Sequence, residues 1–248
     1  MIFNIATFEF RRLFFNPLAW IVLAITQLLV ALVFYNLLSA YLTQPALFEG
    51  QGLTESVVSG FYQSVGVILV LIVPFLTMRL LSEELRSGTM RLLFSSPISV
   101  TQIILGKYLG IVLFLFCILI LISLIPASLA IGTSLDFGHF IACLLGLVLL
   151  MGTLAAIGLF ISSLCRYPAV AAISTFALLI MLWTAHAAGN NSSRLLYGIF
   201  NYLSISRHYT PFTRGLFNTA DLFYFVILCL TCLFLSIWRL DSMRTHHW

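Results

Sequence analysis

The sequence has 248 residues, of which 61% are hydrophobic and only 8% are charged, and its formal net charge is +4. A soluble domain carries about a quarter charged residues, so this composition excludes a soluble globular protein and predicts an integral membrane protein. The basic residues lie at the ends of apolar segments and form no basic run, which argues against a nucleic-acid partner.

The first segment, residues 2–15, predicts an amphipathic helix that lies along the membrane surface. Its expected apolar side consists of Phe3, Ala6, Phe10, Leu13 and Phe14. The polar side includes Arg11 and Arg12, and Asn16-Pro17 would turn the chain into the bilayer. The alternative is that this segment simply extends the first span into the headgroups.

Six apolar stretches approach or exceed the roughly 20 residues that a helix needs to cross a bilayer. They are residues 17–41, 57–78, 103–125, 140–164, 168–186 and 222–238. The predicted fold class is therefore all-α, with one transmembrane domain over residues 1–248. The first stretch is too long for the apolar region of a signal peptide and no small-residue cleavage site follows it, so we expect a retained helix.

The distribution of Lys and Arg predicts the orientation of the chain. With six spans both termini lie on one side, and that side collects nine of the twelve basic residues. The other three, Arg194, Arg207 and Arg214, fall in the loop between the fifth and sixth spans. We therefore expect both termini in the cytoplasm.

That last external loop is predicted to hold two short helices. Thr210-Pro211 offers an N-cap followed by proline at the first helical position. His208 in this loop, like His139 in the preceding external one, is expected to be isolated. We therefore predict no metal site from the histidines.

Small residues four positions apart mark places where helices can approach closely in lipid. The pairs with this spacing are Gly106 with Gly110, Gly152 with Ala156, and Gly158 with Ser162. They predict helix packing and identify no substrate. The C-x-x-C pair, Cys229 and Cys232, lies within the sixth span and is also interpreted as packing.

The spans contain almost no ionisable residues, which argues against an ion-coupled carrier. Thr26, Gln27 and Asn36 in the first span are candidate pathway lining on polarity alone. Glu83-Glu84 and His186 with Asn190 resemble motifs of prenyl-endopeptidase-like membrane proteases. The position that needs Arg is Gly88, however, and the two motifs are predicted about 30 Å apart on opposite faces. No catalytic residue is predicted.

The densest charged stretch is the loop of residues 79–102 between the second and third spans. Ser82 is expected to cap a short helix whose first turn holds Glu83 and Glu84, and Gly88 would let the chain bend. Ser99 with Gln102 has the form of a capping box before the third span. A connector that only orients the protein in the membrane through its arginines could be shorter than this loop. The loop is therefore interpreted as a docking element.

Residues 82–110 resemble the loop signature of the type-2 ABC-exporter permeases, roughly E-E-[RK]-x-x-G-T-[LM]-E-x-L-L-x-x-P-[IV]-[ST] and then G-K. The matching positions are Glu83, Glu84, Gly88, Thr89, Leu92, Leu93, Pro97, Ile98, Gly106 and Lys107. Arg91 stands where that family commonly has Glu. The N-terminal FEFRRLFFNPLAW also resembles the family, and residues 201–225 resemble its gliding-motility and copper-processing subgroup.

The resemblance implies a half-transporter that forms a homodimer, or a heterodimer with a second permease, among the lipids of the bacterial cytoplasmic (inner) membrane. It implies two copies of a separate ATPase subunit that bind ATP and Mg²⁺, with no cofactor on this chain. The sequence agrees with this because it has no G-x-x-x-x-G-K-[ST] motif.

By the same resemblance the 79–102 loop would be a coupling helix seated in a cleft of the ATPase. The implied coupling contacts are Glu83, Glu84, Arg86, Gly88 and Thr89, while Arg11 and Arg12 would belong to the interfacial helix. An alternative stays open, in which the chain is a non-transporting inner-membrane anchor that recruits a soluble partner through residues 82–97. The identity of the substrate does not follow from the sequence.

Overall fold

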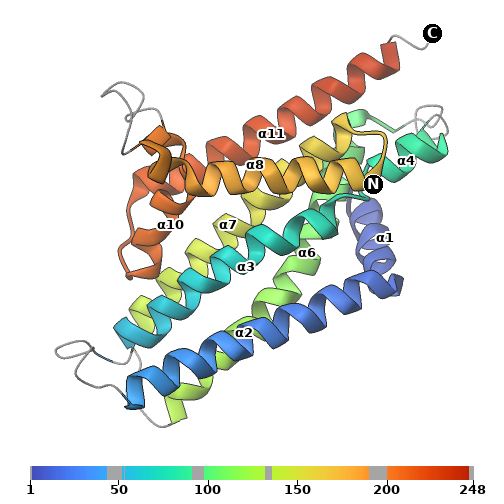
Figure 1. Ribbon diagram of the computed structural model, residues 1–248. Coiled ribbons are helices and arrows are strands. Elements are labelled where there is room, and N and C mark those ends of the chain that lie inside the picture. The colour runs from blue at the N-terminus through green and yellow to red at the C-terminus, as the bar shows by residue number, and fades with distance from the viewer. Residues whose placement is uncertain are drawn as a thin grey trace.

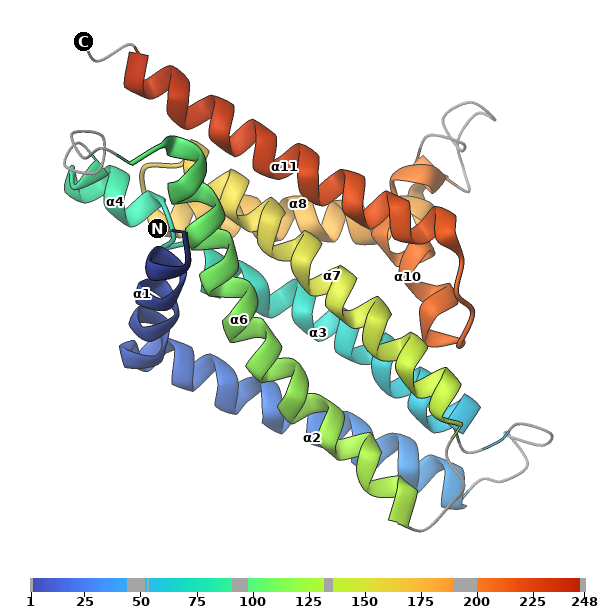
Figure 2. The same cartoon turned by 180° about the vertical axis from the view of Figure 1, so that it is seen from behind.

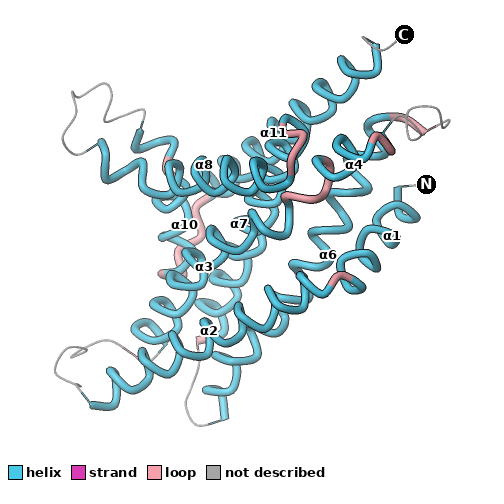
Figure 3. Tube along the Cα trace, turned by 45° about the vertical axis from the view of Figure 1, so that its right-hand side comes forward, coloured by secondary structure: helices cyan, strands magenta, loops and turns pink. Residues whose placement is uncertain are grey.

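The computed structural model describes residues 2–43, 52, 54–90, 98–131, 136–189 and 200–245. Within these residues every regular element is a helix (Figures 1 and 3). Six of the helices are long and apolar enough to cross a membrane. The predicted all-α membrane fold is thus confirmed.

The candidate spans are α2 (Pro17–Thr43), α3 (Ser59–Thr77), α6 (Val100–Ala127), α7 (Phe137–Leu164), α8 (Pro168–Gly189) and α11 (Thr219–Thr245). These ranges overlap the stretches predicted from hydropathy. The second differs at its start, because a turn of π-helix, η2 (Thr54–Val58), precedes α3. The predicted capping box is present at the start of α6, where Ser99 and Gln102 each bond the backbone N–H of the other.

Four further elements are shorter than the candidate spans. They are α1 (Ile2–Phe15), α4 (Ser82–Ser87), the 3₁₀ turn η3 (Ser128–Ile131) and α10 (Ile205–Thr213). Both termini, α1 and α4 gather at one end of the bundle, and α10 lies at the other (Figures 1 and 2). We call these the α4 end and the α10 end.

The core is organised around α7, which packs against α3, α6, α8, α10 and α11. Of its most apolar stretch 61% is buried, against 17% for α2, which packs mainly on α3 and α6. Gly158 of α7 lies against Thr77 of α3 so closely that a Cβ there would overlap the threonine side chain. The small-residue spacing in this span therefore does mark a close helix contact.

The start of α10 differs from the sequence expectation. α10 begins at Ile205 after Ser204, and Pro211 lies inside it, so Thr210-Pro211 is not a helix start. Ile205, Tyr209 and Phe212 are all fully buried, and α10 packs against α7 and α8. Because Ile205 is part of this buried face, burial favours a helix that begins there and includes Pro211. The other predicted short helix has its apolar stripe at Leu195, Leu196, Ile199, Phe200 and Leu203. Residues 200–203 are helical, and residues 190–199 lie outside the described residues.

Candidate functional site

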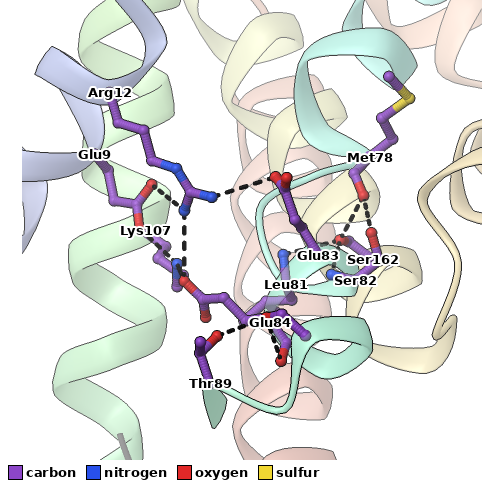
Figure 4. Close-up of polar contacts among 11 residues, drawn as sticks. Glu9, Arg12, Met78, Leu81, Ser82, Glu83, Glu84, Thr89, Lys107 and Ser162 are labelled. Atoms are coloured by element: carbon purple, nitrogen blue, oxygen red, sulfur yellow. Dashed lines mark hydrogen bonds and ion pairs between the residues drawn. The ribbon is translucent and has the colours of Figure 1, made fainter. Parts of the chain in front are cut away.

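Five charged side chains from three helices meet at the α4 end (Figure 4). We call this group the charge cluster. Its members are Glu9 and Arg12 of α1, Glu83 and Glu84 of α4, and Lys107 of α6. The cluster joins three elements that are far apart in the sequence.

Lys107 is the centre of the charge cluster. Its Nζ lies 2.5 Å from Glu9 Oε1 and 2.5 Å from Glu84 Oε1, and only 2% of its side chain is exposed. Arg12 forms the outer part, with Nη2 3.2 Å from Glu83 Oε2 and Nη1 3.6 Å from Glu84 Oε1. Removing one partner of a buried ion pair leaves an uncompensated charge in the interior. The Lys107 ammonium group and the Glu9 and Glu84 carboxylates therefore stabilise one another.

Two glycines of α6 allow α1 to approach closely enough to form this cluster. A Cβ on Gly106 would lie 2.7 Å from Ile5 Cβ, and one on Gly110 would lie 2.8 Å from Glu9 Cβ. Because neither glycine has a side chain, the α1 backbone rests directly on this face of α6. That contact brings Glu9 beside Lys107, which lies between the two glycines.

The buried face of α1 contains most of the predicted apolar side, since Ala6 is buried and Phe10, Leu13 and Phe14 pack against the core. Ala6 and Glu9 are buried against α6, whereas Phe3 is 79% exposed. α1 also ends at Phe15 and does not continue into α2, since the chain turns at Asn16 (Figure 2). The alternative that the segment extends the first span is therefore wrong.

The start of α4 is held by α7. Ser162 Oγ accepts hydrogen bonds from the backbone N–H groups of Leu81 and Ser82, both at 3.1 Å, and donates to the Met78 carbonyl at 3.2 Å. The expectation that Ser82 caps this helix is wrong. Ser82 is the first helical residue and its hydroxyl bonds back to the Met78 carbonyl, so the cap comes from another helix.

The predicted coupling residues separate into an inward and an outward set. Glu83 and Glu84 belong to the charge cluster, whereas Arg86, Gly88 and Thr89 are exposed. Gly88 ends α4 with a φ of 74°, a left-handed conformation that glycine adopts at little cost. The Arg86 guanidinium lies 5.9 Å from the centre of the Tyr167 ring. Residues 91–97 of the signature lie outside the described residues.

The remaining predicted residues are placed on α1 and α2. Arg12 joins the charge cluster, while Arg11 is exposed. Thr26 is buried with its hydroxyl donating to the Val22 carbonyl at 2.6 Å.

The other two candidate lining residues of α2 differ in exposure. Asn36 is exposed. Gln27 Nε2 is buried and has no hydrogen-bond partner among the described residues. The structure does not bring Thr26, Gln27 and Asn36 into contact with the charge cluster.

Sequence reasoning missed Glu9 and the role of Lys107. Glu9 lies between Ala6 and Leu13 of the predicted apolar side, and an acidic residue there is the signal that could have identified it. In the sequence, Lys107 stands out only as a match to the loop signature. Its position inside the Gly106–Gly110 motif was the other available signal.

The α10 end holds a second buried polar group, the histidine pair. His208 Nδ1 lies 2.5 Å from Asp221 Oδ1, and His208 Nε2 lies 3.0 Å from the Tyr202 carbonyl. The ring stacks on Tyr224 with centroids 4.0 Å apart. The expectation that His208 is isolated is therefore wrong, because α10 places it against the first turn of α11.

The charge cluster and the histidine pair suit mechanical coupling between helices better than catalysis. Among the described residues no three His, Cys, Asp or Glu side chains lie close enough together to hold a metal ion. His186 lines a hollow with Arg207 and Arg214 at the α10 end, while Glu83 lines hollows at the α4 end. The two protease-like motifs therefore share no site.

A comparison with protein families gives a match. A family model described as ABC-2 family transporter protein matches residues 3–244. The match runs from α1 through α11 and so includes the charge cluster and all six candidate spans. No curated protein matches the chain.

Proposed function

The chain belongs to the ABC-2 transporter family, and on that premise we propose that it is the permease subunit of an ATP-driven exporter. A separate ATPase subunit, present in two copies, binds ATP and Mg²⁺ and drives a dimer of permeases. The dimer pairs this chain with a second copy or with a related permease. The resemblance of residues 201–225 favours the gliding-motility and copper-processing subgroup.

The observation that carries the proposal is the way α4 is held at the surface. A helix of six residues is too short to be stable alone. Ser162 binds its first turn, Glu84 pairs with Lys107, and Glu83 pairs with Arg12. These contacts leave its last turn exposed in a defined position, as a docking element requires.

A hollow of about 390 Å³ beside α4 offers space for a side chain of the partner. Arg79, Glu83 and Arg86 from one side and Tyr167 from the other line it. Arg86 over the Tyr167 ring gives this hollow a cationic and aromatic rim. In the proposal the ATPase contacts Arg86, Gly88 and Thr89 directly, and the inward pair, Glu83 and Glu84, transmits the movement.

Movement of α4 has two routes into the bundle. One runs through Glu84 and Lys107 to α6, and through Lys107 and Glu9 to α1. The other runs through Ser162 to α7, the central helix. Opening and closing of the ATPase dimer would use both routes to change how the spans pack.

The proposed orientation places the α4 end in the cytoplasm of a bacterial cell, in its cytoplasmic membrane. This orientation puts nine of the twelve basic residues on the cytoplasmic side, where Lys and Arg are in excess in membrane proteins. Thr26, Gln27 and Asn36 would border the transport pathway along α2. The unpartnered amide of Gln27 supports that assignment, since a buried donor needs an acceptor from a partner or a cargo.

Capture of the ATPase tests the proposal. The tagged chain, purified from its native membrane in mild detergent at low salt, should bring down an ABC ATPase. Arg86→Glu should lower the recovered ATPase at least about tenfold, since like charges brought together at an interface cost several kcal/mol. Arg239→Glu is the matched control, because Arg239 is an exposed arginine on α11. Recovery of no ATPase with the unaltered chain would contradict the proposal.

A second measurement separates an exporter from an anchor. Glu84→Gln weakens the link to Lys107 and leaves the exposed turn of α4 unchanged. In an exporter the ATPase should stay bound while its turnover in proteoliposomes changes severalfold, because hydrolysis is linked to movement of the spans. Unchanged turnover with full binding would favour an anchor that recruits a partner without transport.

A further inference from the structure

One stripe of α1 combines basic and aromatic side chains on its exposed surface. Phe8, Arg11, Arg12 and Phe15 have the i, i+3, i+4, i+7 spacing that places residues on one helix face. Phe8 is 67% exposed and Phe15 is 86% exposed. This stripe is distinct from the face, with Ala6, that packs on α6.

A third arginine faces the same stripe. Arg79, in the turn between α3 and α4, lines a hollow of about 590 Å³ together with Arg11 and Arg12. Phe8 and Phe15 lie along the α1 side of this hollow. Two segments remote in sequence therefore direct three guanidinium groups and two aromatic rings to one place.

The charges around this hollow are not balanced. Glu83 is its one acidic lining residue, and Glu83 already pairs with Arg12 at 3.2 Å. Arg11 and Arg79 have no ion pair with any residue that the structure describes. Two unmatched guanidinium groups beside one hollow favour an anion with several acceptor oxygens, and phosphate fits the planar fork of arginine.

The position of the hollow identifies the source of the phosphate. It lies where α1 meets the first span, at Asn16. Trp20 follows in that span, 55% exposed, with its indole N–H donating to the Phe14 carbonyl at 2.7 Å, as expected for an aromatic residue at a membrane interface. A soluble phosphate gains nothing from Phe8 and Phe15, whereas a phospholipid offers these rings an acyl chain.

We propose that the hollow between α1 and the α3–α4 turn binds an anionic phospholipid, with its phosphate between Arg11, Arg12 and Arg79. The acyl chains lie along Phe8 and Phe15. Because Arg12 belongs to both the hollow and the charge cluster, the bound lipid also adjoins α4. This binding requires neither the ATPase nor a cargo, so it goes beyond the proposed function.

The test measures lipid binding to the full chain alone. The purified protein is delipidated in mild detergent and titrated with phosphatidylglycerol, with bound lipid counted by native mass spectrometry. Arg11→Gln with Arg79→Gln should weaken binding about 25-fold, from roughly fivefold for each lost charge. Arg11→Lys with Arg79→Lys should keep most of the affinity.

Two controls make the result specific. Arg207→Gln with Arg214→Gln removes two exposed arginines from the hollow of about 500 Å³ at the α10 end, and should leave phosphatidylglycerol binding unchanged. Glycerol phosphate at millimolar concentration should not displace the lipid, because it lacks the acyl chains. If the double glutamine variant does not fold, Arg11→Gln alone should weaken binding about fivefold.

Three outcomes would overturn the proposal. Equal phosphatidylglycerol affinity in the unaltered chain and the Arg11 and Arg79 variants would show that these arginines hold no headgroup. Displacement by glycerol phosphate would show a site for soluble phosphate. Unchanged lipid affinity with lost ATPase capture would assign the arginines to the protein partner, and this result leaves the exporter proposal standing.

Discussion

The two ends of the molecule bury charge in different ways. At the α4 end the charge cluster joins Glu9 to Lys107, residues separated by 98 positions. At the α10 end the histidine pair joins His208 to Asp221, separated by 13 positions. The first links helices that are far apart in the sequence, and the second closes a short loop.

The charge balance of the two groups also differs. Three carboxylates and two cations give the charge cluster one excess negative charge, whereas one carboxylate and one histidine form the pair. Glu84 Oε2 is buried and has no hydrogen-bond partner among the described residues. α10 is also fixed by its buried apolar face, while α4 makes few contacts beyond its polar ones. The cluster should therefore set the position of α4, and the pair should add only stability.

Removal of Lys107 should have the largest effect. Lys107→Met removes the buried ammonium group between Glu9 and Glu84 and leaves them only the longer contacts with Arg12, at 3.9 Å and 3.6 Å. We therefore expect the free energy of unfolding in mixed micelles to fall by about 3–5 kcal/mol. Adding Glu9→Gln should recover part of this loss, because one uncompensated charge is then removed. Equal stability of Lys107→Met and the unaltered chain would mean that the cluster does not hold the helices together.

The second-largest effect is expected from a substitution that separates α1 from α6. Gly106→Leu inserts a side chain where Ile5 lies, and overpacking of this kind costs about 1–3 kcal/mol. Amide hydrogen exchange in α1 should rise, since Glu9 moves away from Lys107. Gly60→Ala is the matched control, because its Cβ would lie 3.4 Å from Leu37 Cδ2 with room to adjust. Equal protection of α1 in both variants would argue against the glycine contact.

Loss of the histidine pair should be smaller and local. Asp221→Asn keeps an acceptor oxygen but removes the charge facing His208, so we expect about 1–2 kcal/mol lower stability. Thermal unfolding should report this loss, while ATPase turnover in the complex should stay unchanged. A fall in coupled turnover would contradict the division of roles between the two ends.

The smallest expected effect concerns the cap of α4. Ser162→Ala removes the acceptor for the N–H groups of Leu81 and Ser82, which should cost about 1 kcal/mol and speed hydrogen exchange at those amides. Ser163→Ala is the matched control, since among the described residues the Ser163 hydroxyl bonds only the Phe160 carbonyl of its own helix. Equal exchange in the two variants would show that α7 does not fix the start of α4.

The fold class could be predicted from sequence because the bilayer imposes one simple requirement, a long apolar run for each span. Local signals also succeeded. The Ser99–Gln102 capping box and the glycine end of α4 depend on residues that are neighbours in the chain. The family resemblance rested on such a local stretch, and the family match agrees with it.

The contacts that build the site could not be predicted because they depend on distant residues. Ser162 was interpreted as a small packing residue, yet its hydroxyl caps a helix some 80 positions earlier in the sequence. His208 was expected to be isolated because Asp221 is brought to it only by the packing of α10. Nothing local in the sequence distinguishes such a polar residue from one that bonds its own helical turn.

The separation of Glu9 from Lys107 has a consequence for biosynthesis. Ribosomes add roughly 5–20 residues each second, so Glu9 precedes Lys107, 98 residues later, by about 5–20 s. During that interval an ionised Glu9 has no buried cation and must stay hydrated. The first helix can therefore settle on the third span only after that span has been made. This ion pair can therefore form only after α6 has begun to be made, but it can form before synthesis of α7 supplies Ser162 to cap α4.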